Sequence, residues 1–218
     1  MYQKKPIITR SDALLISAAA WAQWTARAQD ELARHHRERP LLAGMAKAAL
    51  HSRVLPDVDA KAWDALCAAW EEEGWLRRGG ELVALASFAP HVPERLKPLV
   101  DGLLAEWEQA GLHAPDWRAL CQAHHLAERD AEDLRTYLLA SGQAQPLDDD
   151  RIVPSAAVQN ALRALWNATG KEGRFTLQEA RDVLGLSRKT LIPLLELADR
   201  LGYTRREEAV RVWVKEPG

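Results

Sequence analysis

The residues best suited to chemistry with a ligand are cations near the carboxyl end of the chain. Arg188 and Lys189 follow Ser187 at the start of a predicted helix. The hairpin predicted to come next adds three more cations, Arg205, Arg206 and Arg211. The exposed N–H groups and the dipole at a helix amino terminus attract phosphate, and nearby cations strengthen that attraction. The pattern therefore predicts contact with the phosphates of a nucleic acid.

Two helices must position these cations. Thr176 and Glu179 have the spacing of a capping box, which opens a helix that we expect to end near Leu184. Gly185 supplies a left-handed stop, and Ser187 caps the second helix. That helix has apolar residues at helical spacing, which predicts that they face inward: Leu191, Leu194, Leu195 and Ala198.

The hairpin after the second helix pairs 203–206 with 210–213. A helix, a tight turn, a second helix and a basic hairpin together predict a winged helix. Winged helices also serve as plain protein-interaction modules, so from the residues alone nucleic-acid binding and protein binding both stay open.

The same order of elements recurs along the chain at intervals of about 60 to 80 residues, as an architectural repeat. We expect a mainly α fold with small β-hairpins as wings, arranged as tandem winged-helix modules. The predicted helices are 18–37, 44–52, 60–74, 93–111, 116–124, 128–141, 156–168, 176–184 and 188–201. The predicted strand pairs are 75–78 with 81–85, and 143–147 with 151–153.

The predicted domains follow from this repeat. Residues 1–16 are expected to be the wing hairpin left from a preceding module, as if the chain began inside a fourth copy. Three winged helices then follow, over 17–90, 91–153 and 154–218, and the last is expected to bind RNA. The connections between them are short, which favours stacked modules over freely moving ones.

Charge and composition narrow the function classes. Residues 151–218 contain 12 Lys and Arg against 8 Asp and Glu, whereas residues 1–150 contain 17 against 23, so the positive region is confined to the carboxyl-terminal third. No apolar run is long enough for a membrane span, and no secretion signal is evident, so we expect a cytoplasmic protein. Cys67 and Cys121 lack the spacing of a zinc site and are predicted to be buried thiols.

Other candidate sites give weaker signals. His35–His36 and His124–His125 are adjacent pairs, which point about 100° apart on a helix, so we interpret them as helix-end residues rather than metal ligands. The runs 71–73 and 148–150 are interpreted as solvated acidic residues. No phosphate-binding glycine loop is present, so we expect this chain not to be an enzyme and to hold no cofactor or metal. Helical spacing places most tryptophans in the core: Trp21, Trp24, Trp63, Trp70, Trp107 and Trp166.

Two segments resemble a known family. From Gly173 to Arg206, with Gly185-Leu186-Ser187-Arg188-Lys189 at its centre, the chain is similar to the last winged helix of the bacterial selenocysteine-specific translation elongation factor. A second segment, from His35 to Met45, resembles a loose "HxxHPLxPGM" pattern in the second winged helix of that factor, with departures at Arg39 and Ala43. The middle module matches by position more than by motif.

The resemblance implies an RNA-binding arm. In this family a GTPase part, which needs GTP and magnesium, carries selenocysteinyl-tRNA, while the winged-helix arm holds the selenocysteine insertion sequence, an mRNA stem-loop beside a recoded UGA codon. It implies contact with the ribosome through the full-length factor, no membrane partner and a monomer. The alternatives are a winged-helix interaction scaffold or a DNA-binding regulator. By analogy, the RNA-binding residues would be Ser187, Arg188, Lys189, Arg205 and Arg206, with Arg174, Thr190 and Arg211 as weaker candidates.

Overall fold

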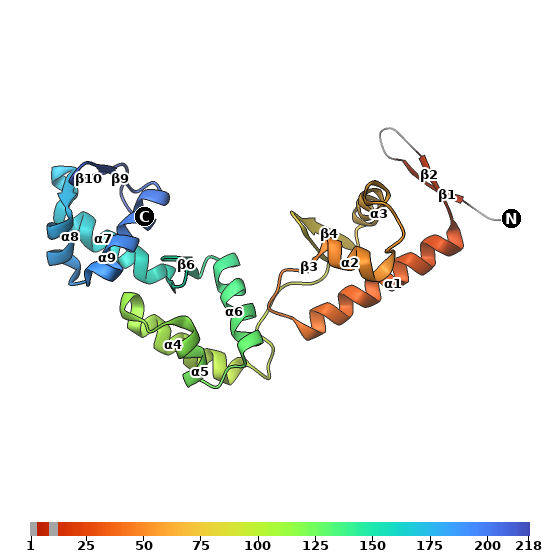
Figure 1. Cartoon of the computed structure of the whole chain (residues 1–218), viewed down its shortest axis with the longest axis horizontal. Helices are drawn as coiled ribbons and strands as arrows, with labels where there is room; N and C mark the ends of the chain where they lie inside the picture. The colour runs from red at the N-terminus through yellow and green to blue at the C-terminus, as the bar shows by residue number, and fades with distance from the viewer. Residues whose placement is uncertain (1–3, 9–12) are drawn as a thin grey trace. The chain divides into compact units, whose positions relative to one another are not determined.

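The computed structural model describes residues 4–8 and 13–218, with side chains described from residue 16 onward. The chain divides into two compact units, residues 1–93 and 94–218. It is mainly helical with small antiparallel sheets, as the sequence predicts (Figure 1). No helix within the described part of the chain is both long and apolar enough to cross a bilayer.

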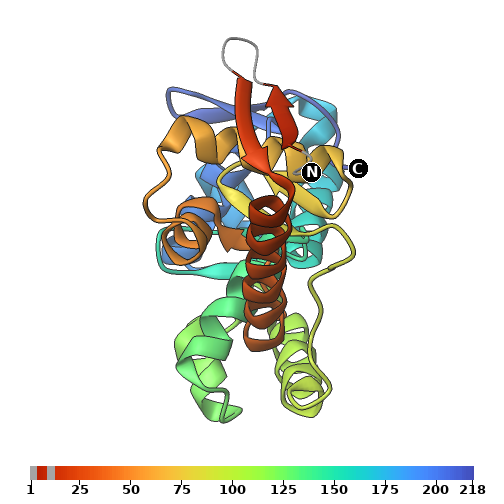
Figure 2. The same cartoon turned by 90° about the vertical axis from the view of Figure 1, so that its right-hand side faces the viewer.

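The first unit begins with a β-hairpin that leads directly into a long helix (Figure 2). Its turn lies outside the described residues, and whether the hairpin belongs to a preceding module stays a prediction. The elements of this unit are β1 (Lys4–Ile8), β2 (Ala13–Ser17), α1 (Ala18–Glu38), β3 (Met45–Ala46), α2 (Lys47–Val54), α3 (Ala60–Glu72), β4 (Leu76–Gly79) and β5 (Leu82–Leu85).

Capping and periodicity explain the helices of the first unit. Ser17 accepts a hydrogen bond from the N–H of Ala20 at 3.2 Å and so starts α1. The carboxylate of Asp59 accepts a hydrogen bond from the N–H of Ala62 at 2.9 Å and so starts α3. The buried faces of the two helices meet in one core in which Trp70 is completely buried. Both tryptophans of α1 contribute to this core, which confirms the predicted interior role.

The small sheet of the first unit differs from the prediction in one strand. Met45 and Ala46 were predicted to begin a helix, but they form β3, which pairs with β5 so that the order is β3-β5-β4. Gly44, just before it, passes so close to β5 that an added Cβ would lie 2.5 Å from the carbonyl oxygen of Val83. Glycine is therefore required there for the strand to dock.

His36 also corrects the interpretation of the histidine pairs. Its side chain is only 6% exposed, its Nε2 accepts a hydrogen bond from the N–H of Leu85 at 3.2 Å, and its ring stacks on Phe88 with centroids 3.7 Å apart. Burial lowers the pKa of His36 to about 4. His36 is therefore a neutral packing residue that joins α1 to the wing.

The second unit continues the same plan of helices and short strands. Its elements are α4 (Lys97–Ala110), η1 (Gly111–His113), α5 (Trp117–Ala123), α6 (Glu128–Ala140), β6 (Ala144–Pro146), β7 (Ile152–Pro154), α7 (Ser155–Thr169), η2 (Gly170–Glu172), β8 (Arg174–Thr176), α8 (Leu177–Leu184), α9 (Arg188–Arg200), β9 (Thr204–Glu207) and β10 (Val210–Trp213). The predicted division of this unit near residue 153 stays a prediction.

The cysteines are buried in both units, as predicted. Cys67 lies in α3 and Cys121 in α5, and neither forms a disulfide. Burial raises the pKa of each thiol to about 12, so both stay protonated near neutral pH. These thiols therefore pack as small apolar groups.

Trp213 anchors the last sheet to its helices. Its indole N–H donates to the hydroxyl of Thr169 at 3.0 Å, and its ring packs edge-on against Trp166. It is only 9% exposed, so this residue, at the end of β10, belongs to the core. The sheet is also wider than predicted, because residues 174–176 form β8 and give the order β8-β10-β9.

Candidate nucleic-acid interface

The turn between α8 and α9 forms as the sequence predicts. The Thr176 hydroxyl accepts from the N–H of Glu179 at 3.2 Å, while the carboxylate of Glu179 accepts from the N–H of Thr176 at 2.6 Å. These bonds form a complete capping box. Gly185 ends α8 with φ of 63°, in the left-handed region that suits glycine. The turn therefore sets where α9 begins.

The start of α9 is open to an anion. Ser187 occupies the N-cap position, but its side chain makes no capping bond to the backbone N–H groups of the helix. Its hydroxyl instead lies 3.5 Å from the hydroxyl of Thr190. Arg188 and Lys189 are both exposed beside these N–H groups. The site thus combines backbone donors, the positive end of the helix dipole and two cations.

A hollow of about 170 Å³ lies between α9 and the hairpin β9–β10; we call it the wing hollow. Arg188 lines it from the helix and Arg206 from β9, so the structure brings these two predicted residues to one place. Its remaining lining combines apolar side chains with a carboxylate and a third arginine, from Phe175, Leu177, Ile192, Glu208, Ala209, Val210 and Arg211. A lining that combines arginines with apolar side chains suits a group with a polar edge and a flat apolar face.

Arg211 is not an exposed cation, and its role in RNA binding stays a prediction. Its side chain is about nine-tenths buried, and its Nε donates to the carboxylate of Asp199 at 3.1 Å. The same carboxylate accepts a hydrogen bond from the hydroxyl of Thr204. Arg211 therefore ties β10 to the end of α9 and β9, and most of its charge is compensated within the protein.

The other candidates occupy separate positions. Arg205 is exposed on β9 and forms an ion pair with Glu207, its Nε lying 3.2 Å from the carboxylate. Arg174 is exposed on β8, at the opposite edge of the sheet from β9. Neither Arg205 nor Arg174 lines the wing hollow.

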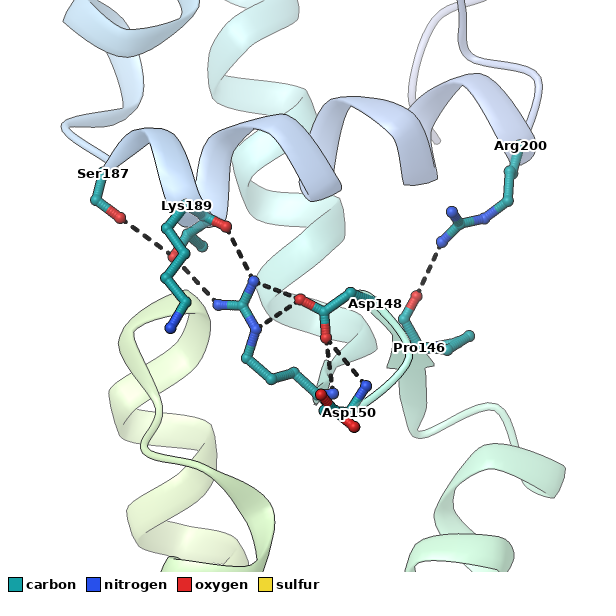
Figure 3. A network of polar contacts seen from close by, with 8 residues as sticks. Pro146, Asp148, Asp150, Ser187, Lys189 and Arg200 are labelled. Atoms are coloured by element: carbon teal, nitrogen blue, oxygen red, sulfur yellow. Dashed lines mark hydrogen bonds and ion pairs between the residues drawn. The ribbon is translucent and has the colours of Figure 1, made fainter.

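A proline in α9 links its start to the preceding hairpin. Pro193 has no N–H, so the carbonyl of Lys189, four residues earlier, lacks the usual helical partner. Arg151 fills this position, because its Nη2 donates to the Lys189 carbonyl at 2.9 Å and its Nη1 lies 3.5 Å from the Thr190 hydroxyl (Figure 3). The predicted site residue Thr190 is therefore already engaged within the protein.

Asp148 holds Arg151 in this position. Its carboxylate accepts from the Arg151 Nε at 2.8 Å and from the N–H of the same residue, also at 2.8 Å. The hydrogen bond from the Arg151 side chain lowers the pKa of Asp148. At the other end of α9, Arg200 donates to the carbonyl of Pro146 at 3.1 Å (Figure 3). Both ends of α9 are thus fastened to the β6–β7 hairpin.

These contacts correct one interpretation and add residues that the sequence did not reveal. Asp148 is part of an ion pair rather than a purely solvated acidic run. Arg151 and Lys189 are 38 residues apart, so no local pattern predicts their contact. One signal was available, because a proline inside a helix always leaves a carbonyl four residues earlier in need of another donor.

Replacing Arg151 by alanine is expected to lower the free energy of unfolding by about 1–3 kcal/mol, because it removes the donor to a carbonyl that has no helical partner. The measurement is urea unfolding followed by circular dichroism. Arg118→Ala is the matched control, since Arg118 forms an exposed ion pair with Glu128 and should cost less than about 1 kcal/mol. Equal losses in the two variants would contradict a positioning role for Arg151.

Two family models match the chain. A model described as elongation factor SelB, winged helix, for the second such domain matches residues 29–85. A model with the same description for the third domain matches residues 167–213, which include the start of α9 and the wing hollow. No match was found among curated proteins.

A solved structure shows the same fold. A crystal structure of bacterial selenocysteine-specific elongation factor EF-Sec is 19% identical, with a TM-score of 0.60, and the match covers 96% of this chain and 32% of that one. The chain therefore spans about a third of the length of that relative. The mRNA-binding domain of elongation factor SelB from E. coli, in complex with SECIS RNA, is also 19% identical, with a TM-score of 0.49 and coverage of 57% and 100%.

The domain models match in the order in which the modules occur along the chain, and each covers helices and a wing that the structure contains. Residues 29–85 and 167–213 are therefore similar to the second and third winged-helix domains of elongation factor SelB.

Proposed function

We propose that this chain is the RNA-binding arm of a selenocysteine-specific elongation factor. In this role the arm recognises a stem-loop in mRNA, the selenocysteine insertion sequence. It thereby tethers the GTPase part of the factor and selenocysteinyl-tRNA beside a recoded UGA codon. The observation that carries the proposal is that Arg188 and Arg206 line the same hollow, next to a helix start whose N–H groups have no side-chain cap.

The geometry supports two kinds of contact with RNA, one with phosphates and one with a base. Phosphates of the stem-loop are bound by the backbone N–H groups at the start of α9 and by Arg188 and Lys189, which fixes the orientation of the RNA. A base that is unstacked in the loop enters the wing hollow, where Arg206 can stack on it or donate hydrogen bonds to its edge. Specificity then resides in the loop rather than in the stem.

The form of double-helical RNA favours this arrangement. Its major groove is deep and narrow, so a complete recognition helix does not enter it as it enters the major groove of DNA. The short exposed face formed by Ser187, Arg188 and Lys189 suits a contact made by the end of the helix. The whole factor's other properties belong to the same proposal: GTP and magnesium bind outside this chain, the ribosome is contacted through the full-length factor, and the arm works as a cytoplasmic monomer.

Competition between nucleic acids tests the proposal against a DNA-binding regulator. The chain is mixed with a labelled RNA stem-loop that follows a UGA codon in a selenoprotein message, and unlabelled competitors are added in a filter-binding assay. Duplex DNA of equal length is expected to compete at least about 100-fold less well than the unlabelled stem-loop, a difference of about 2.7 kcal/mol. Equal or better competition by the DNA would refute RNA recognition.

A further inference from the structure

A second group of arginines lies in the first unit, whose residues 1–93 contain 12 Lys and Arg against 11 Asp and Glu. A hollow of about 480 Å³ is formed by one face of α1 and the end of α2; we call it the arginine hollow. Four of the side chains that line it are arginines, and the others are two carboxylates and two small apolar groups. The lining consists of Arg27, Asp30, Glu31, Ala33, Arg34, Arg37, Arg53 and Val54.

Glu31 organises two of the arginines. Its carboxylate contacts the guanidinium of Arg53 at 2.7 Å and also that of Arg34, so one negative charge holds two positive ones. The carboxylate side chain is only 16% exposed, whereas both guanidinium-bearing side chains are about half exposed. Burial opposes ionisation of Glu31, but the hydrogen bonds from Arg53 and Arg34 outweigh it and lower the pKa of this residue.

The other two arginines are less engaged. Arg27 lies near the backbone carbonyl of Arg53, with its Nη2 at 3.4 Å. Arg37 is exposed and makes no hydrogen bond or ion pair with the described part of the chain. Four guanidinium groups therefore face two carboxylates, Asp30 and Glu31, and the hollow keeps a net positive charge.

We propose that the arginine hollow binds the phosphodiester backbone of double-helical RNA, at a surface separate from the wing hollow. Every cation in the arginine hollow is an arginine, whose planar guanidinium can donate two hydrogen bonds to the oxygens of one phosphate. A surface that served only solubility would contain lysines as well. From Arg27 to Arg37 the face of α1 extends about 15 Å, enough for several successive phosphates. This spacing favours a regular duplex over a single phosphate.

The experiment measures binding of the complete chain to a blunt RNA duplex two helical turns long, which has no loop. Fluorescence anisotropy is recorded over a range of salt concentrations. The double variant Arg27→Gln with Arg37→Gln removes the two arginines that do not hold Glu31, so the ion pairs of Glu31 stay intact. The control is Arg118→Gln with Arg129→Gln, which removes the same charge from exposed positions on α5 and α6.

The arginine-hollow variant is expected to bind the duplex about tenfold more weakly, with the slope of log affinity against log salt reduced by about 1 to 2. The control variant should change the affinity less than about threefold. Equal effects of the two variants, or no binding of the duplex by the original chain, would overturn the inference. Tighter binding of a polyglutamate peptide than of the duplex would overturn it as well, because an acidic protein segment would then be the better ligand.

This test can fail without affecting the proposed function. If the arginine-hollow variant binds the duplex normally while Arg188→Ala with Lys189→Ala loses the stem-loop, only the second surface is refuted. If Arg188→Ala with Lys189→Ala binds the stem-loop normally while the arginine-hollow variant no longer binds the duplex, only the proposed function is refuted.

Discussion

Replacing Arg188 and Lys189 together by alanine is expected to weaken binding of the RNA stem-loop by about 100-fold. Each lost charge-assisted contact with phosphate costs about 1.4 kcal/mol, or a factor of ten in the dissociation constant. Both side chains are exposed at the start of α9, so their removal should leave the helix and its core unchanged. The affinity is measured by filter binding, and helicity is checked by circular dichroism.

The matched control for this prediction is Lys171→Ala with Arg181→Ala, which also removes one lysine and one arginine. These residues are exposed in the same module but lie on η2 and α8, outside α9 and the wing strand that carries Arg206. Their loss should reduce affinity less than about threefold, through a weaker general attraction. If both pairs of substitutions had the same effect, the basic surface as a whole would bind RNA, and the start of α9 would have no special role.

The largest expected effect on stability is a pH dependence of the free energy of unfolding, caused by His36. Its pKa is about 4 in the folded protein because burial disfavours the charged ring, and the neighbouring His35 and Arg77 add repulsion. An unfolded histidine titrates near its ordinary value of 6.5. Because the unfolded chain binds the proton more readily, this contribution to stability is complete above about pH 6.5 and is lost as the pH falls towards 4.

The loss is expected to reach about 3 kcal/mol in the free energy of unfolding of the complete chain between pH 7 and pH 4, since each unit of pKa difference corresponds to 1.36 kcal/mol. Urea unfolding at a series of pH values measures it. His36→Gln is the informative variant, because glutamine can still accept the N–H of Leu85 but does not titrate. A dependence on pH as steep in this variant as in the original chain would show that other groups cause it.

Local signals in the sequence predicted the main helices well. Thr176, Glu179 and Gly185 specify the start and the end of α8 by chemistry that acts within one helical turn, and the structure contains each of those bonds. The tryptophans of α1, α3 and α4 follow the helical period, and all of them are buried except Trp24, which is partly buried against the core. In such cases neighbouring residues alone determine the structure.

Features that depend on distant residues were missed. β3 and β8 are only two and three residues long, too short to show a period, and they form because β5 and β10 offer free edges. Arg211 resembles an exposed wing cation in the sequence, but it lies on the inner face of β10 opposite Asp199, a partner twelve residues earlier. The structure therefore brings Arg188 and Arg206 to one hollow and buries Arg211, while the RNA-binding role of these residues stays a prediction.

The most direct measurement of the central claim compares the stem-loop with the same stem closed by an unrelated loop, as competitors in the filter-binding assay. Because the proposed function places an unstacked base of the loop in the wing hollow, the exchanged loop is expected to compete at least about 30-fold less well, a difference of about 2 kcal/mol. Equal competition by the two RNAs would show that the chain binds only the stem and would contradict the account.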